Sequence, residues 1–173
     1  MADNEQHTIG NSNGSGVPVS LRSIEPGAAK ELAEAIAAMP PWVRYPYEPA
    51  LLQHYLETQE ADAPRFVIRA GDEIAGVAGL RLNWLRGPYL QMLAVLPDFQ
   101  RQGLGGIVLN WLEREARARQ EKNLWVCASD FNPDALRFYE RHGFRRVGVL
   151  DGLVMEAHAE ILMRKRLSGE RHT

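Results

Sequence analysis

The sequence predicts a mixed α+β domain, and two observations carry that prediction. Strand-like apolar runs over 65–70, 73–82 and 89–96 are separated by short turns that contain glycine, which is typical of an antiparallel meander. The third run is then followed by an amphipathic helix over 104–118 and a further strand over 123–129. A connection through a helix makes the strands on either side of it parallel. We therefore expect a mixed sheet with helices packed on it.

Composition excludes several classes of function. The 173 residues fit one domain, with 45% apolar and 24% charged residues. A net charge of −2 gives no reason to expect nucleic acid or an anionic membrane as partner. Cys127 is the only cysteine, so we expect neither a disulfide framework nor a cysteine metal site, and no metal at all. Without a signal peptide or an apolar stretch near ~20 residues, the expected location is the cytoplasm.

The remaining elements follow in chain order. Residues 1–16 are polar and glycine-rich and are expected to form a flexible tail, as are residues 168–173. Residues 17–167 form the expected folded domain. Its further strands are predicted over 17–24, 144–150 and 159–167, and its further helices over 28–39, 50–57 and 132–142.

An aromatic loop stands between the first two helices. Trp42, Tyr45 and Tyr47 occur within six residues that also contain proline. Such rings can pack a helix pair onto a sheet, or they can line a substrate pocket with an apolar surface that carries polar groups. Both interpretations remain open from the residues alone.

The stretch from Gln100 to Gly106 is a glycine-rich turn between a strand and a helix. Glycines there let the backbone approach a ligand, and the first turn of a helix offers N–H donors that suit phosphate. A Walker loop would need a lysine that is absent, and a dinucleotide fingerprint would need glycine where Val108 stands. The pattern Gln/Arg-x-x-Gly-x-Gly/Ala is matched in full by Gln100, Gly103 and Gly105.

A second motif lies in the last third of the chain, from Asn132 to Phe144. Asn132 followed by Pro133 is a strong helix start, and Gly143 suits the end of that helix. The run matches N-x-x-A-x-x-x-Y-x-x-x-G-F at every fixed position.

With both motifs in this order, the chain resembles the GNAT superfamily of N-acetyltransferases from about residue 17 to residue 167. The resemblance implies a mainly antiparallel sheet of about seven strands, flanked by helices. It also implies that the central parallel strands 89–96 and 123–129 splay apart and admit acetyl-CoA. The cofactor-binding residues that it implies are Leu93, Ala94 and Val95 for the pantetheine arm, Gln100, Arg101, Gln102, Gly103, Leu104, Gly105 and Gly106 for the pyrophosphate, and Asn132, Ala135 and Phe138 for pantetheine or adenine.

The resemblance also assigns catalytic roles. Tyr139 would lie beside the thioester sulfur as general acid, although a tyrosine on an apolar helix face can also be a core residue. Many relatives carry a glutamate base on the strand where this chain has Gln91, which cannot accept a proton. We expect Gln91 to contact the substrate instead. Asp130, Glu156, His158 or a chain of waters could serve as base instead.

The sequence thus predicts an acetyl-CoA-dependent N-acetyltransferase that transfers the acetyl group directly to a primary amine of a small molecule. A protein or peptide N-acetyltransferase and a non-catalytic acyl-CoA-binding module are the alternatives. The aromatic loop and the missing carboxylate at Gln91 favour an acceptor with an apolar body and a weakly basic amine. The protein is expected to be a monomer or a homodimer.

Overall fold

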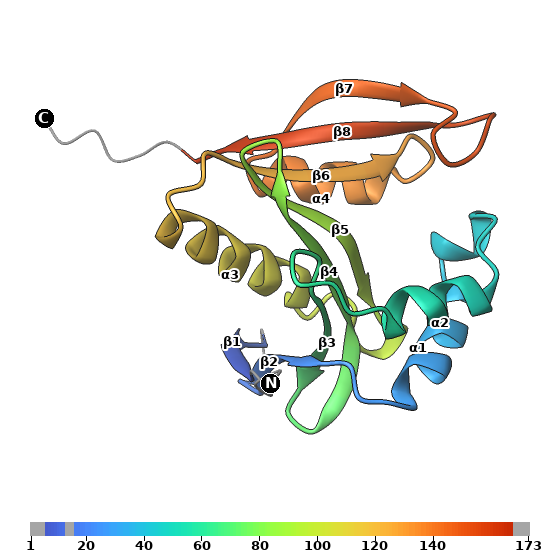
Figure 1. The fold of residues 1–173 in the computed structure, drawn as a ribbon, viewed down its shortest axis with the longest axis vertical. Coiled ribbons are helices and arrows are strands. Elements are labelled where there is room, and N and C mark those ends of the chain that lie inside the picture. The colour runs from blue at the N-terminus through green and yellow to red at the C-terminus, as the bar shows by residue number, and fades with distance from the viewer. Residues whose placement is uncertain (1–5, 13–15, 168–173) are drawn as a thin grey trace, which may run out of the picture. The chain divides into compact units, whose positions relative to one another are not determined.

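The computed structural model describes residues 6–12 and 16–167, and its strands form one mixed sheet (Figure 1). The strand order is β1-β2-β3-β4-β5-β6-β8-β7, and only β5 and β6 pair in parallel among the pairings recorded for these residues. The elements are β1 (His7–Asn11), β2 (Pro18–Ser23), α1 (Ala28–Ala37), η1 (Trp42–Arg44), α2 (Pro49–Glu57), β3 (Arg65–Ala70), β4 (Glu73–Trp84), β5 (Gly87–Val95), η2 (Pro97–Phe99), α3 (Leu104–Ala118), β6 (Asn123–Ser129), α4 (Pro133–Arg141), β7 (Arg145–Asp151) and β8 (Ala159–Arg166).

The predicted fold class is confirmed, with one strand more than expected. Each of the seven predicted strands and four predicted helices is present, with ends that differ by a few residues. The eighth strand is β1, which lies inside the stretch predicted as a tail, so that prediction is wrong for His7–Asn11. Its backbone pairs with β2 and its single large apolar residue, Ile9, is buried. The rest of the predicted tails, residues 1–5, 13–15 and 168–173, lies outside the described residues.

The chain divides into two compact units. The first comprises Met1–Gly79 with Met92–Val108, and the second comprises Leu80–Gln91 with Leu109–Thr173. The division therefore passes through β4, β5 and α3. Within the described part of the chain, no helix is both long and apolar enough to span a membrane.

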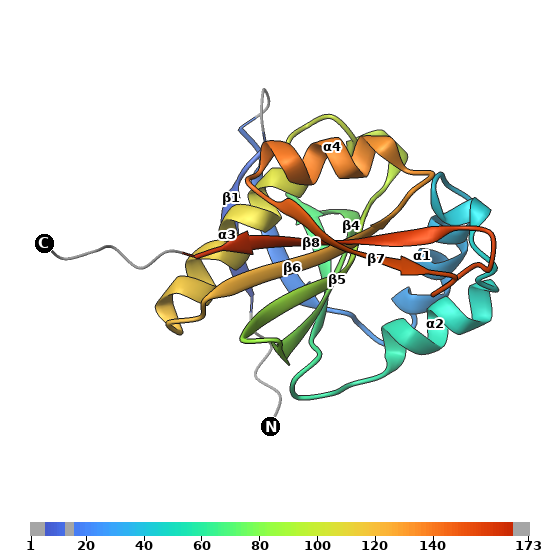
Figure 2. The same ribbon diagram turned by 90° about the horizontal axis from the view of Figure 1, so that it is seen from above.

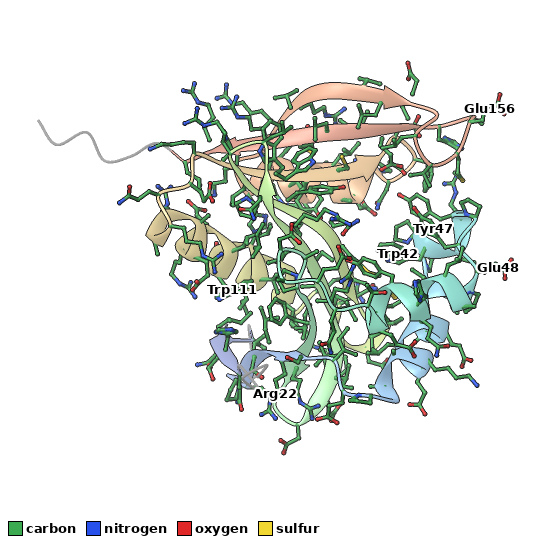
Figure 3. The ribbon with its side chains drawn as sticks, in the orientation of Figure 1. Arg22, Trp42, Tyr47, Glu48, Trp111 and Glu156 are labelled. Carbon is green, nitrogen blue, oxygen red and sulfur yellow. The ribbon has the colours of Figure 1, made fainter. Side chains whose placement is uncertain are left out.

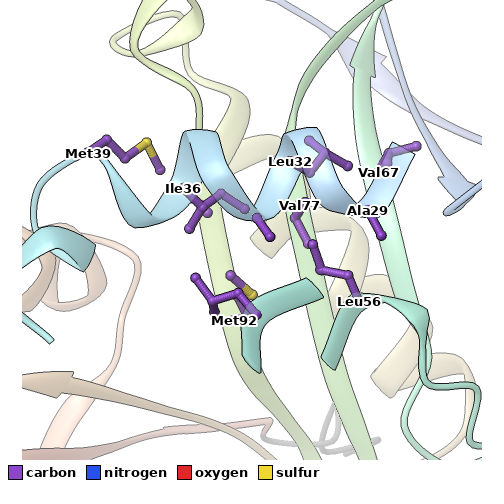
Figure 4. Close-up of a cluster of buried hydrophobic side chains, with 11 residues drawn as sticks. Ala29, Leu32, Ile36, Met39, Leu56, Val67, Val77 and Met92 are labelled. Atoms are coloured by element: carbon purple, nitrogen blue, oxygen red, sulfur yellow. The ribbon is translucent and has the colours of Figure 1, made fainter. Parts of the chain in front are cut away.

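The core of the first unit forms where α1 and α2 cover strands β3, β4 and β5 (Figure 4). The apolar residues of α1 recur at helical spacing, so they form one stripe that faces the sheet. Val67, Val77 and Met92 meet this stripe from the three strands. The members of the cluster are Ala29, Leu32, Ala33, Ile36, Met39, Leu52, Leu56, Val67, Val77, Met92 and Ala94.

A glycine sets how closely β4 and β5 approach in this unit. A Cβ placed on Gly76 would lie 2.1 Å from the carbonyl oxygen of Ala94 and 3.1 Å from Cα of Val95. No real side chain fits at such distances, so this position of β4 requires glycine. The contact therefore fixes the backbone of β5 near the strand's end.

The second unit is organised around β6, β8 and β7, which run side by side and antiparallel (Figure 2). Ser129 lies opposite Glu160, and Trp125 lies opposite Arg164. On β8, Lys165 donates to Glu113 of α3, so α3 lies on the face of β8 that carries Lys165. β5 joins this unit through the parallel pair Tyr89–Trp125 and its neighbour.

We predict that Gly76→Ala destabilises the protein, because the added methyl group overlaps the backbone of β5. The expected loss of unfolding free energy is about 1–3 kcal/mol, the usual range for overpacking. Gly148→Ala on β7 is the matched control, since a Cβ there meets nothing nearer than 3.7 Å. Urea unfolding measures both variants, and equal unfolding free energies for the two would contradict the close approach at Gly76.

Candidate functional site

The turn from Gln100 to Gly103 leads from η2 directly into the N-terminus of α3. Arg101 and Gly103 adopt left-handed backbone conformations, with φ of 61° and 80°. The side-chain amide of Gln102 donates to the carbonyl of Asp98 at 3.0 Å and so holds the turn. Because an arginine rarely occupies this conformation, the turn is a locally strained segment of the kind that often binds ligands.

The helix start that follows presents backbone donors. At the start of α3, the N–H of Ile107 donates a hydrogen bond to the carbonyl of Gly103 at 3.1 Å. The N–H groups of Leu104, Gly105 and Gly106 precede that bond, so the helix itself gives them no acceptor. Together with the positive end of the helix dipole, these groups can bind an anion such as a phosphate.

The end of β5 presents backbone groups in a fixed direction. The N–H of Leu96 donates to the carbonyl of Ala75 on β4 at 2.8 Å. Because the peptide groups of successive residues in a strand point to opposite edges, those of Val95 and Leu93 point away from β4. The amide of Gln100 donates to the carbonyl of Val95 at 3.0 Å. The predicted loop residue Gln100 therefore ties the turn to the predicted pantetheine strand.

The predicted residues of the second motif come together on α4. Asn132 is the N-cap, and its side-chain oxygen accepts from the N–H of Ala135 at 3.2 Å. Tyr139 is buried, with ring contacts to Phe138 at 5.2 Å and Phe144 at 5.6 Å. Phe138 and Ala135 are half-buried, so the helix keeps part of this face accessible.

The aromatic loop packs on the core at one end and is exposed at the other. Trp42 packs against the core cluster of the first unit, as the packing interpretation expects. Tyr45 contacts the ring of Trp42 at 5.8 Å and stacks on Tyr47 at 5.4 Å. Tyr47 is exposed, and Figure 3 labels it together with Trp42. The stack thus runs from the core to the surface of this unit.

The three predicted bases differ in their surroundings. The imidazole Nδ1 of His158 lies 2.9 Å from Asp130, whose carboxylate also accepts from the N–H of Ala159. These contacts, the backbone one first, lower the pKa of Asp130, so it is a poor base near neutral pH. Glu156 is exposed on the loop between β7 and β8 (Figure 3). Gln91 of β5 is exposed as well.

A carboxylate that the sequence interpretation missed lies on β8. Glu160 is only 7% exposed, and it accepts a hydrogen bond from the hydroxyl of Ser129, which is fully buried. Burial, followed by the neighbouring Cys127 and by the charge of Glu160, raises the pKa of Tyr89. Burial also raises the pKa of Cys127, so the thiol is protonated and is not a thiolate nucleophile. An acid at the start of an apolar strand was the signal for Glu160 in the sequence.

Comparisons with known proteins agree with these features. An acetyltransferase from Agrobacterium fabrum is 39% identical over 71 residues, which cover 41% of this chain and 48% of that protein. The S-(2-succino)cysteine N-acetyltransferase from Bacillus subtilis is 30% identical over 110 residues, which cover 59% of this chain and 66% of that protein. The chain thus spans about half to two thirds of the length of these curated relatives.

A solved structure extends the likeness in fold over most of the chain. The crystal structure of the ribosomal-protein-S18-alanine N-acetyltransferase from Escherichia coli matches with a TM-score of 0.67 at 22% identity, covering 90% of this chain and 99% of that one. The model of the acetyltransferase (GNAT) family matches residues 29–144, which include the turn before α3 and all of α4. The chain therefore belongs to the GNAT family of acetyltransferases.

Proposed function

We propose that this protein is an acetyl-CoA-dependent N-acetyltransferase that transfers acetyl directly to a primary amine of a small molecule. The main support for the proposal is the strained turn at Arg101 and Gly103, which leads into the backbone N–H donors at the start of α3. Membership of the family supports acetyl-CoA as the ligand of that turn.

The cofactor would be held mainly by backbone. Its pyrophosphate would bind the N–H groups of Leu104, Gly105 and Gly106, where the helix dipole favours negative charge. Its pantetheine amides would pair with Leu93 and Val95, whose peptide groups point away from β4. Such pairing resembles the addition of a short strand, so it requires no particular side chain on β5.

Gly105→Glu tests the binding loop. A carboxylate at this position would occupy the phosphate site and repel the anion, so we expect acetyl-CoA binding to be lost in titration calorimetry. Asn110→Glu is the matched control, because it adds the same charge to an exposed position of α3, beyond the first turn. Equal affinity of Gly105→Glu and the unaltered protein would show that the phosphates bind elsewhere.

Tyr139 would act as the general acid of the transfer. The amine lone pair attacks the thioester carbonyl carbon, a C–N bond forms and the C–S bond breaks. The leaving sulfur takes the phenolic proton of Tyr139, which is then replaced by the proton that the new amide nitrogen loses. A tyrosine suits this role, because its phenol hydroxyl can donate a proton to the leaving sulfur.

Tyr139→Phe separates this role from packing. We expect unchanged affinity for acetyl-CoA and a kcat lower by about 10²–10⁴-fold, the usual contribution of one positioned acid. Tyr55→Phe is the matched control. It removes the hydroxyl group of a tyrosine on α2, whose ring lies under the guanidinium of Arg65, and should leave kcat unaltered. If Tyr139→Phe has the same kcat as the unaltered enzyme, Tyr139 is a core residue without a catalytic role.

The acceptor would be a small amine with an apolar body. The stack of Trp42, Tyr45 and Tyr47 offers flat apolar surface and phenol groups, which suit a ring better than a polyamine. The Bacillus subtilis relative is named for the N-acetylation of a modified amino acid. The Escherichia coli structure, named for an alanine of a ribosomal protein, keeps a peptide amine as the second candidate.

A competition assay distinguishes these acceptors. Phenylalanine amide, 2-phenylethylamine, spermidine, a lysine peptide and a peptide with N-terminal alanine are offered at equal concentration, and products are measured by mass spectrometry. We expect the two small aromatic amines to react fastest, with Trp42→Ala slowing them and Leu51→Ala, an exposed residue of α2, having no effect. Fastest turnover of spermidine or a peptide, undiminished by Trp42→Ala, would contradict this acceptor.

A further inference from the structure

We propose that the face of β7 and β8 that is turned away from α3 and α4 binds a phosphate group, either as the free ion or as part of a phosphate monoester. The inference goes beyond the proposed function and does not rest on it. The residues concerned are three arginines, Arg145 on β7 and Arg164 and Arg166 on β8, which we call the arginine cluster. All three belong to the second unit of the chain.

The strand register places the arginine cluster on one face of the sheet. Arg145 lies directly opposite Arg164, and directly opposed residues of an antiparallel pair share a face. Arg166 follows Arg164 by two positions on β8, so it lies on the same face. Like charges in directly opposed positions destabilise a sheet. An anion bound between the arginines would offset this repulsion.

The cations on the opposite face are each matched by an acid. The ammonium group of Lys165 bonds Glu113 of α3. Arg146, which follows Arg145 on β7, donates to Glu140 of α4 at 2.8 Å. Because side chains alternate along a strand, both α3 and α4 lie on the face that the arginine cluster does not share.

The arginine cluster has no such match within the described residues. None of the ion pairs found there involves Arg145, Arg164 or Arg166. Glu160 shares their face, but it lies four positions from Arg164 along β8, which is about 13 Å at the usual rise of a strand. That separation is too large for a direct ion pair. The anion that fits between these guanidinium groups is therefore a ligand.

The chain holds the guanidinium group of Arg164 in place. Its Nε donates to the side-chain oxygen of Asn123 at 2.6 Å, and its Cζ lies 5.5 Å from the ring centre of Trp125. A cation at that distance over an indole ring is attracted by it. The bond to Asn123 uses one of the five N–H donors of the arginine, so the terminal amino groups can bind two oxygens of a phosphate.

A strained turn between β4 and β5 supports this arrangement. Leu85 and Arg86 both have positive φ, 43° and 63°, where a hairpin turn normally contains asparagine or glycine. The side-chain amide of Asn123 donates to the carbonyls of Leu85 and Arg86, at 3.3 Å and 3.2 Å. The indole N–H of Trp125 donates to the carbonyl of Leu85 at 3.2 Å. These bonds orient Asn123 and Trp125, and both then contact Arg164.

Phosphate fits the arginine cluster better than a carboxylate does. A phosphate monoester carries close to two negative charges near neutral pH, with three accepting oxygens, so it can bond more than one guanidinium group. A carboxylate carries one charge and pairs with a single guanidinium group. An aromatic ester also finds a ring beside the cluster, because Trp84 is half-buried and packs against Trp125 with centroids 5.3 Å apart.

NMR titration with inorganic phosphate and with phenyl phosphate tests the site. The Nε–H signal of Arg164 and the indole N–H signal of Trp125 report on this face alone, whatever binds at the start of α3. We expect both signals to shift and the dissociation constant obtained from them to rise about tenfold or more in Arg145→Gln, as for the loss of one hydrogen bond to a charged group. Arg146→Gln is the matched control, because it removes the same charge from the next residue of β7, on the opposite face, and should bind as the unaltered protein does.

The two probes also distinguish the source of the phosphate. Tighter binding of phenyl phosphate than of inorganic phosphate indicates an ester whose ring lies on Trp84, and equal affinity indicates the free ion. Three results would each overturn the inference: no shift of either signal with phosphate in large excess, equal weakening by Arg145→Gln and Arg146→Gln, or tighter binding of succinate than of phosphate. None of these results depends on whether the protein acetylates an amine.

Discussion

The close approach of β4 and β5 at Gly76 is the constraint on which the proposed cofactor site depends. It fixes the end of β5, and the bond from Leu96 to Ala75 then sets which edge each peptide group of that strand faces. Gln100 bonds the carbonyl of Val95 and so couples the strand to the turn that opens α3. The backbone donors of the strand and of the helix start are therefore fixed by one continuous segment.

This arrangement explains why the cofactor motif is short. A site made of backbone N–H groups needs glycine where the chain must turn and one side chain that holds the turn in place, and it tolerates almost any residue elsewhere. The chemistry of the transfer, in contrast, requires particular side chains. The one that we propose, Tyr139, belongs to the second unit, where α4 positions it.

Much of the fold could be predicted from the sequence, because periodicity and glycine turns mark seven of the strands and all four helices. Asn132 followed by Pro133 placed the start of α4 correctly, since capping is a local property of the chain. β1 could not be predicted, because one buried residue, Ile9, and pairing with β2 stabilise it within a polar stretch. Both are properties of the folded molecule.

The same distinction applies to the site. The turn at Gly103 was found because its residues are contiguous, whereas Glu160 was missed because its partner Ser129 is 31 positions away in sequence. Asp130 and His158 were separate candidate bases in the sequence, whereas the folded chain pairs them with each other. Only the register of β6 against β8 brings the buried carboxylate of Glu160 beside Ser129.

Amide hydrogen exchange, followed by NMR with and without acetyl-CoA, tests the central claim most directly. If the cofactor binds through backbone groups of β5 and α3, the N–H groups of Val95 and of Leu104 to Gly106 should exchange more slowly in its presence. The N–H of Leu96, which already donates to β4, should change little. Protection confined to other parts of the chain, with Val95 and Gly105 unaffected by saturating acetyl-CoA, would contradict a backbone-held cofactor at this turn.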